Sequence, residues 1–156
     1  MTRSGLSPLQ KQLQRGGVLD SSAHAPDALA DAAREQGLAF FSADCDRARS
    51  RSAAMRAIAK AVDFPEFFGG SFDALYDCLC DTVLDQKGGV VLWLEKLHSG
   101  DPALKDDAKR IETVCGDVAD FAKENGRVFA FAISHAGRHP DPVPGEAQSW
   151  SATGGD

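Results

Sequence analysis

The sequence predicts an α/β protein built on a small parallel sheet. Three compact apolar runs have the length of buried strands, and they span residues 38–43, 90–95 and 128–133. The segments between these runs repeat apolar residues at helical spacing, and strands that alternate with such helices are joined by crossovers that make the sheet parallel. The chain has 156 residues, of which 43% are hydrophobic, so it has the size and composition of one folded domain. We therefore expect three parallel strands flanked by helices, or four if a short N-terminal segment joins the sheet.

The first 37 residues are expected to form an N-terminal extension packed on the main domain. Residues 1–15 are polar and mixed in charge, which predicts a loose arm. Residues 17–19 can form a short strand, and a helix is expected to begin with Pro26 in its first turn and to end at Gly37. The residues of this helix expected to face inward are Ala28, Leu29, Ala32 and Ala33.

Two more helices are predicted from capping residues and apolar spacing. One is capped by Ser50 or Ser52, carries Met55, Ile58, Ala59 and Val62 on one face, and ends at Phe64, which precedes a proline. The other is long and is closed by Asn125 and Gly126. Its inward residues are expected to be Leu104, Ala108, Ile111, Cys115, Val118 and Ala122.

The C-terminal residues 135–156 are expected to be a disordered tail. They contain a proline-rich stretch and few apolar residues, too few to stabilise a packed structure. His135 and His139 are spaced like metal ligands, but their place in this tail favours incidental surface histidines.

The net charge of the chain is concentrated in one segment. The chain has 17 Lys and Arg against 23 Asp and Glu, a formal charge of −6. Residues 1–62 and 87–156 cancel each other, and residues 63–86 contain six acidic residues and no Lys or Arg. This balance argues against nucleic acid as the main partner, because phosphates would be repelled, and favours a basic protein.

Apolar runs such as residues 90–94 are far shorter than the roughly 20 residues that a membrane span needs, and no signal-peptide core is evident. The sequence therefore predicts a cytoplasmic protein without membrane contact.

Residues 71–85 predict a helix with one acidic face. Ser71 follows two glycines and is a candidate N-cap, and Phe72, Leu75, Tyr76, Leu79 and Val83 form an apolar face. On the opposite face, Asp73, Asp77, Asp81 and Asp85 are each four residues apart, so they are expected to form an exposed acidic stripe. Like charges at this spacing oppose helix formation, and carboxylates are unfavourable near a helix C-terminus. A local rule that is broken repeatedly indicates a functional surface.

The sequence gives weaker signals for metal binding, acid/base catalysis, phosphate binding and thiol chemistry. Asp73 and Asp77 have the residue types of a metal or acid/base pair, but an outward stripe offers no concave pocket for it. Gly69 and Gly70 before the helix are better explained as a turn than as a phosphate cradle. The cysteines lack zinc spacing and disulfide pairing signals, so reduced, packed thiols are expected at Cys45, Cys78, Cys80 and Cys115. We predict no metal, no cofactor and no enzymatic activity.

The residues from Phe64 to Asp81, FPEFFGGSFDALYDCLCD, resemble the signature loop and acidic helix of the barstar family, intracellular inhibitors of the ribonuclease barnase. The resemblance extends more loosely over residues 38–134, and it implies a small three-layer α/β fold. It also implies an inhibitory surface formed by the EFFGGS loop and the acidic helix, with Asp77 as the central carboxylate and Asp73 beside it. The expected contact residues are Phe67, Gly69, Ser71, Asp73, Tyr76, Asp77, Cys80 and Asp81. A glutamate contact that the family takes from a later helix falls near Phe121 here, so Asp117, Asp120 and Glu124 are the candidate substitutes.

The resemblance implies a function as a monomer that forms a 1:1 complex with a basic ribonuclease and occludes its active site. The charge pattern agrees, because a row of carboxylates can occupy a site that binds phosphates. Two alternatives stay open: an acidic interaction domain for a basic partner that is not a nuclease, and a metal-dependent acid/base enzyme that uses Asp73 and Asp77.

Overall fold

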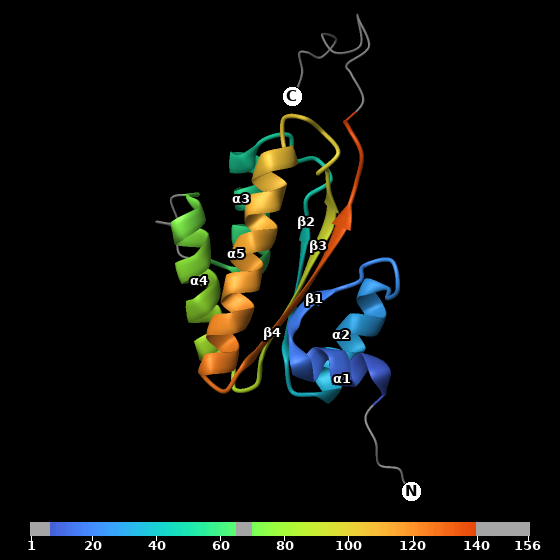
Figure 1. The fold of residues 1–156 in the computed structure, drawn as a ribbon, viewed down its shortest axis with the longest axis vertical. Helices are drawn as coiled ribbons and strands as arrows, with labels where there is room; N and C mark the ends of the chain where they lie inside the picture. The colour runs from blue at the N-terminus through green and yellow to red at the C-terminus, as the bar shows by residue number, and fades with distance from the viewer. Residues whose placement is uncertain (1–6, 65–69, 140–156) are drawn as a thin grey trace, which may run out of the picture.

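The computed structural model of the chain describes residues 7–64 and 70–139, and within them four parallel strands are flanked by five helices (Figure 1). The strand order across the sheet is β1-β4-β3-β2, so the two longest strands lie in the centre. The fold class predicted from the apolar runs is confirmed. In chain order the elements are α1 (Pro8–Arg15), β1 (Gly17–Leu19), α2 (Pro26–Glu35), β2 (Ala39–Asp44), α3 (Arg51–Val62), α4 (Phe72–Asp85), β3 (Gly89–Leu97), α5 (Lys105–Glu124) and β4 (Val128–His135).

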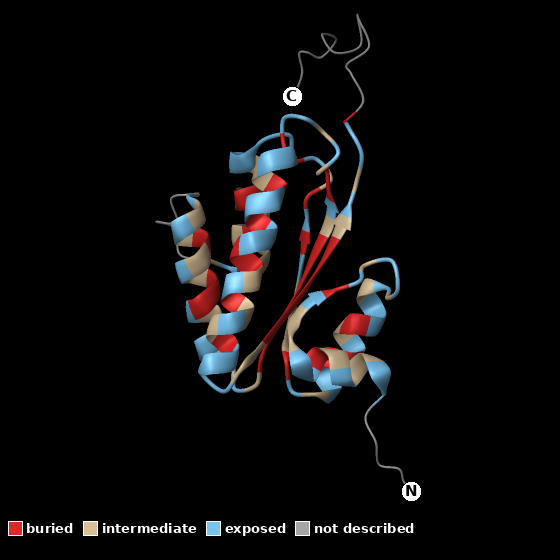
Figure 2. Cartoon of the chain, viewed as in Figure 1, coloured by how far each residue is buried: buried red, intermediate tan, exposed pale blue. Residues whose placement is uncertain are grey.

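The central strands are apolar over residues 89–94 and 128–133 because helices cover both faces of the sheet, and Figure 2 shows the middle of these strands as buried. Side chains alternate between the faces, so Leu92 and Leu94 of β3 belong to one core while Val91 and Trp93 belong to the other. β3 begins at Gly89, whose φ of 131° is suited to glycine and where a Cβ would overlap the backbone of Val128 on β4. Gly89 therefore allows the two central strands to start side by side.

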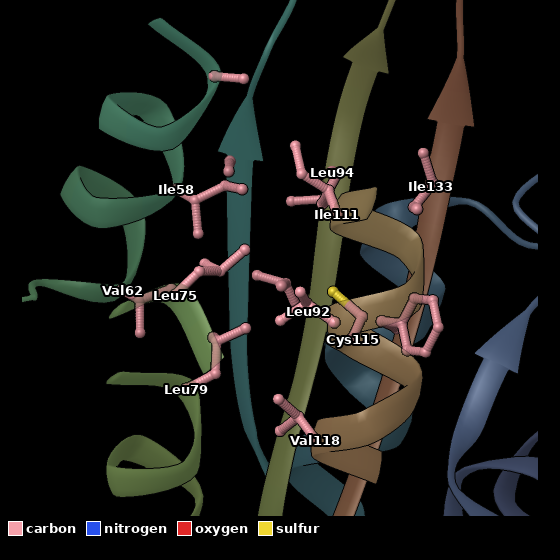
Figure 3. Packing of buried hydrophobic residues seen from close by; sticks show 14 of the residues in the cluster. Ile58, Val62, Leu75, Leu79, Leu92, Leu94, Ile111, Cys115, Val118 and Ile133 are labelled. Atoms are coloured by element: carbon pink, nitrogen blue, oxygen red, sulfur yellow. The ribbon is translucent and has the colours of Figure 1, made fainter. Parts of the chain in front are cut away.

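The larger core lies between the sheet and helices α3, α4 and α5 (Figures 1 and 3). Each helix contributes most of the apolar face expected from its spacing, but Ala59 and Leu104 are not part of this core. Ser50 is the residue that caps α3, through a hydrogen bond from the amide of Ala53. Figure 3 shows the facing side chains of this core, which include Ile58, Val62, Leu75, Leu79, Leu92, Leu94, Ile111, Cys115, Val118 and Ile133.

The smaller core lies on the opposite face, under α1 and α2 (Figure 1). β4 contributes the buried Ala130 and Ala132 and the partly buried Val128 to this side. The prediction of a loose arm over residues 1–15 is wrong for residues 8–15, which form α1 because Ser7 caps the helix and Leu13 is fully buried against the sheet. Ala28 on α2 was also predicted to face inward, but it is exposed, because the face of α2 toward the sheet is formed by other residues, Leu29, Ala32 and Ala33.

The prediction of a tail beginning at residue 135 is also wrong for its first five residues. His135 is the last residue of β4, and the amide of Ala136 donates to the carbonyl of Leu97 at 2.8 Å. His139 is buried rather than a surface histidine, because its ring packs on His98 and is hydrogen-bonded on both nitrogens. The rest of the predicted tail, residues 140–156, lies outside the described residues.

Candidate partner-binding site

Helix α4 has a buried apolar face and an exposed acidic face, and together they fix its orientation on the domain. Ser71 caps it, with its hydroxyl oxygen accepting from the amide of Ala74 at 3.0 Å. Leu75, Leu79 and Val83 are buried in the larger core, and this burial fixes which side of the helix faces water. The acidic stripe, Asp73, Asp77, Asp81 and Asp85, is exposed at every position, as its spacing predicts.

The C-terminal end of α4 is stabilised from outside the helix. Its last turn contains no basic residue and ends at Asp85, a charge that the helix dipole disfavours. The guanidinium of Arg127, which precedes β4, donates to the carbonyl oxygens of Gln86 at 3.0 Å and Leu84 at 3.3 Å. A cation from a distant part of the chain thus caps the helix at the end where its own sequence is unfavourable.

A hollow of about 570 Å³ lies between α4 and α5, which run side by side (Figure 1). α4 contributes Asp73 and Asp77 to it, and α5 contributes Asp117; all three side chains are exposed. The other residues that line this acidic hollow are Phe72, Tyr76, Arg110, Thr113 and Val114. Two carboxylates of the predicted stripe are therefore joined by a third from a different helix.

Arg110 is the single cation among the described residues that line the acidic hollow. Its guanidinium carbon lies 4.6 Å from the centroid of the Phe72 ring, and that of Arg51 lies 5.6 Å from the same centroid, so Phe72 lies within reach of two cations. The ion pairs found within the described part of the chain are Arg34–Asp31, His98–Asp46 and His139–Asp101, and none of them involves the acidic stripe. Three carboxylates against one guanidinium leave the hollow negative.

Tyr76 connects the hollow to the core. Its ring contacts Phe121 edge to face, with the centroids 6.4 Å apart, and its hydroxyl donates to the thiol of Cys80. This hydrogen bond is the main cause that raises the pKa of the phenol, followed by desolvation and by the negative charges of Asp117 and Glu124. The family glutamate was expected near Phe121, and the aromatic ring of Phe121 instead packs against Tyr76.

The structure distinguishes among the predicted contact residues. Asp73, Tyr76 and Asp77 meet in the acidic hollow, whereas Asp81 lies outside it, further along the stripe. Ser71 is exposed but serves as the helix cap, and the side chain of Cys80 is buried. Phe67 and Gly69 lie outside the described residues.

The sequence pattern alone did not identify the contribution of α5 to the hollow. Of the three candidate substitutes for the family glutamate, Asp117 lines the hollow, and Asp120 and Glu124 do not. Arg110, Thr113 and Asp117 recur three and four residues apart, which predicts a common helix face. The spacing does not say that this face lies beside α4.

The remaining reactive groups are the metal-ligating side chains and the thiols of the described residues. Within residues 7–64 and 70–139, no three His, Cys, Asp or Glu side chains converge in a way that could hold a metal ion. The four cysteines are free thiols, and burial raises the pKa of both Cys45 and Cys115 to about 12. A thiol with such a pKa is a packing group rather than a nucleophile.

Among the helices of the described residues, none combines the length and the apolar composition needed to cross a bilayer. No curated protein matches the sequence. Residues 38–134 match the family model described as Barstar (barnase inhibitor), and this segment runs from just before β2 to the end of β4 and contains both the acidic stripe and the acidic hollow. Because the match covers more than half of the chain, the protein belongs to the barstar family.

Proposed function

We propose that this protein is an intracellular inhibitor that binds a basic ribonuclease in a 1:1 complex and covers its active site. The observation that carries the proposal is the acidic hollow, where α4 and α5 bring Asp73, Asp77 and Asp117 together. The chain that forms this hollow matches a family described as barnase inhibitors. The acidic stripe extends the negative surface through Asp81 and Asp85, and the structure pairs neither of these with a described cation.

The physical basis is electrostatic complementarity. A ribonuclease site binds phosphates through basic side chains, so a surface that places carboxylates at fixed spacing can occupy that site in place of RNA. The helices α4 and α5 fix the backbone positions that carry the carboxylates, so little backbone entropy is lost on binding. Inhibition by occlusion requires no chemistry from the inhibitor.

Within this proposal, Asp77 is the central carboxylate and Asp73 its neighbour. Tyr76 supplies an aromatic contact surface at the side of the hollow, and Ser71 and Cys80 position the helix and the tyrosine. Phe67 and Gly69, in the loop before α4, are proposed as further contacts on the basis of the family resemblance.

The test is an RNA-cleavage assay with a panel of basic microbial ribonucleases, barnase among them, titrated with the wild-type chain, Asp77→Ala and Asp85→Ala. We expect stoichiometric inhibition of at least one enzyme by the wild type, a loss of inhibition in Asp77→Ala, and near-normal inhibition by Asp85→Ala, which removes the same charge from the same helix outside the hollow. The association rate should fall as salt is added. Equal inhibition by Asp77→Ala and the wild type would reject the assignment. A tight complex with a basic protein that cleaves no RNA would instead support a non-nuclease partner.

A further inference from the structure

Two histidines form a buried, stacked pair at one end of the sheet, away from the acidic hollow. His98 follows β3, and His139 lies four residues after the end of β4; their relative exposures are 8% and 7%. The ring centroids are 3.7 Å apart and the planes differ by 25°. Two carboxylates flank the pair, Asp46 after β2 and Asp101 between β3 and α5. The carboxyl ends of three neighbouring parallel strands thus meet the C-terminal segment at this point.

Every ring nitrogen of the pair faces an acceptor oxygen. His98 has Nε2 at 2.8 Å from Oδ1 of Asp46 and Nδ1 at 2.6 Å from the carbonyl oxygen of Gly137. His139 has Nδ1 at 2.9 Å from Oδ2 of Asp101 and Nε2 at 3.0 Å from the carbonyl oxygen of Asp46. A neutral imidazole has only one N–H, so only the doubly protonated ring can donate to both of its partners. Asp46 and Asp101 thus place one carboxylate beside each ring.

These contacts hold the chain that follows β4. Gly137 and His139 are bound through the histidine pair, and the amide of Gly100 donates to the carbonyl of Ala136 at 3.0 Å. The approach is close enough that a Cβ on Gly100 would lie 2.9 Å from Cα of Gly137. Residues 136–139 therefore pack closely against residues 97–101 and the histidine pair.

We propose that His98 and His139, with Asp46 and Asp101, form a proton-dependent clasp that holds residues 136–139 on the domain and releases them as His98 loses a proton. The neutral ring leaves one nitrogen lone pair opposite a carboxylate or carbonyl oxygen, which weakens the seat of Gly137 and His139. The geometry is that of a switch rather than a metal site, because the ring nitrogens point to four separate oxygens.

The direction of the pH dependence follows from the groups that face the pair. Desolvation on its own would lower the pKa of His98, but the hydrogen bonds to Asp46 and Gly137 and the charge of Asp46 outweigh it, so this pKa is raised above its ordinary value of about 6.5. Because the pKa of His98 is raised in the closed clasp, protonation of His98 stabilises that state fully below about pH 6.5. This stabilisation is lost as the pH rises through the pKa of His98 in the closed state.

The pKa values of the two carboxylates determine the lowest pH at which the clasp stays closed. The hydrogen bond from His139 is the main cause that lowers the pKa of Asp101 to about 2, and the pKa of Asp46 is lowered by its hydrogen bond with His98 and by the charge of Lys96. The clasp is therefore expected to be fully stabilised from about pH 4 to about pH 6.5 and to open as the pH rises through the raised pKa of His98 in the closed state.

The peptide bond after Arg138 is a trypsin site inside the clasped segment, so its cleavage in the full chain reports opening. We would measure this cleavage by mass spectrometry from pH 5.5 to 8.5 and divide each rate by that of a synthetic peptide of residues 132–145. In the wild type this ratio should rise with pH, by up to about tenfold per pH unit for each proton released. Ring ¹⁵N shifts of His98 in the full chain should show both nitrogens protonated at the acid end.

Three variants make the test specific. Asp46→Asn removes the carboxylate at almost constant shape and should flatten the pH dependence, whereas His24→Gln removes a histidine outside the clasp and should leave it unchanged. Gly100→Ala alters no titratable group, and it should raise cleavage at pH 5.5 toward that of the free peptide because its Cβ crowds Gly137. A wild-type ratio that stays constant across the pH range, an unchanged slope in Asp46→Asn, or full protection in Gly100→Ala would each overturn the proposal.

Discussion

Replacing Asp117 by Asn tests whether the binding surface extends from α4 to α5. Asn keeps the shape of the side chain and removes one of the three carboxylates of the acidic hollow. A pair of unit charges 4 Å apart is worth about 1 kcal/mol in water and about 4 kcal/mol at the effective dielectric near a protein surface. These limits correspond to roughly a fivefold and a several-hundredfold weaker complex, so we expect a loss of at least about fivefold in the affinity for an inhibited ribonuclease. Asp120→Asn, on the same helix outside the hollow, should cost less than about 1 kcal/mol.

The same variant gives a second measurement that needs no partner. Tyr76 is the only tyrosine in the chain, so the ultraviolet absorbance of phenolate reports its ionisation alone. The hydrogen bond to Cys80 is the main cause of its raised pKa, and the charge of Asp117 adds to it because a nearby anion disfavours phenolate. Asp117→Asn should therefore lower the pKa of Tyr76, and Asp120→Asn should not. If both variants titrate like the wild type and bind a ribonuclease equally well, the account of the acidic hollow is wrong.

Two further predictions concern cations near the stripe. Arg110→Ala removes the one cation from the lining of the hollow, so a basic ribonuclease should bind faster and up to about fivefold tighter, as measured by stopped-flow inhibition kinetics. Lys109→Ala is the matched control, and an equal gain in both variants would show that only net charge matters. Arg127→Ala removes the donors to the carbonyls of Leu84 and Gln86, so it should lower the free energy of unfolding by about 1.5–3 kcal/mol in urea titrations. Lys87→Ala is the control and should change this free energy little. An Arg127→Ala protein as stable as the wild type would contradict the capping role.

Local sequence patterns determined the strands, most helices and the acidic stripe. Three apolar runs predicted the three long strands, because residues buried on both faces of a sheet are apolar without alternation. Ser71 and the four-residue spacing of the aspartates predicted where α4 begins and which side faces water, since both depend on contacts within a few residues. The acidic character of the candidate site was therefore readable from the sequence.

The partners of that site, and the ends of the domain, were decided only by tertiary structure. Asp117 and Arg110 share a face of α5, but packing of α5 beside α4 is what brings them to Asp73 and Asp77. Helix α1 has a mostly polar sequence, and burial of Leu13 against the sheet stabilises it. His139 lies in a sequence that looks like a tail because its partners, His98 and Asp46, are 41 and 93 residues away along the chain. Periodicity reports contacts within one element, whereas these contacts join elements that only the folded sheet places together.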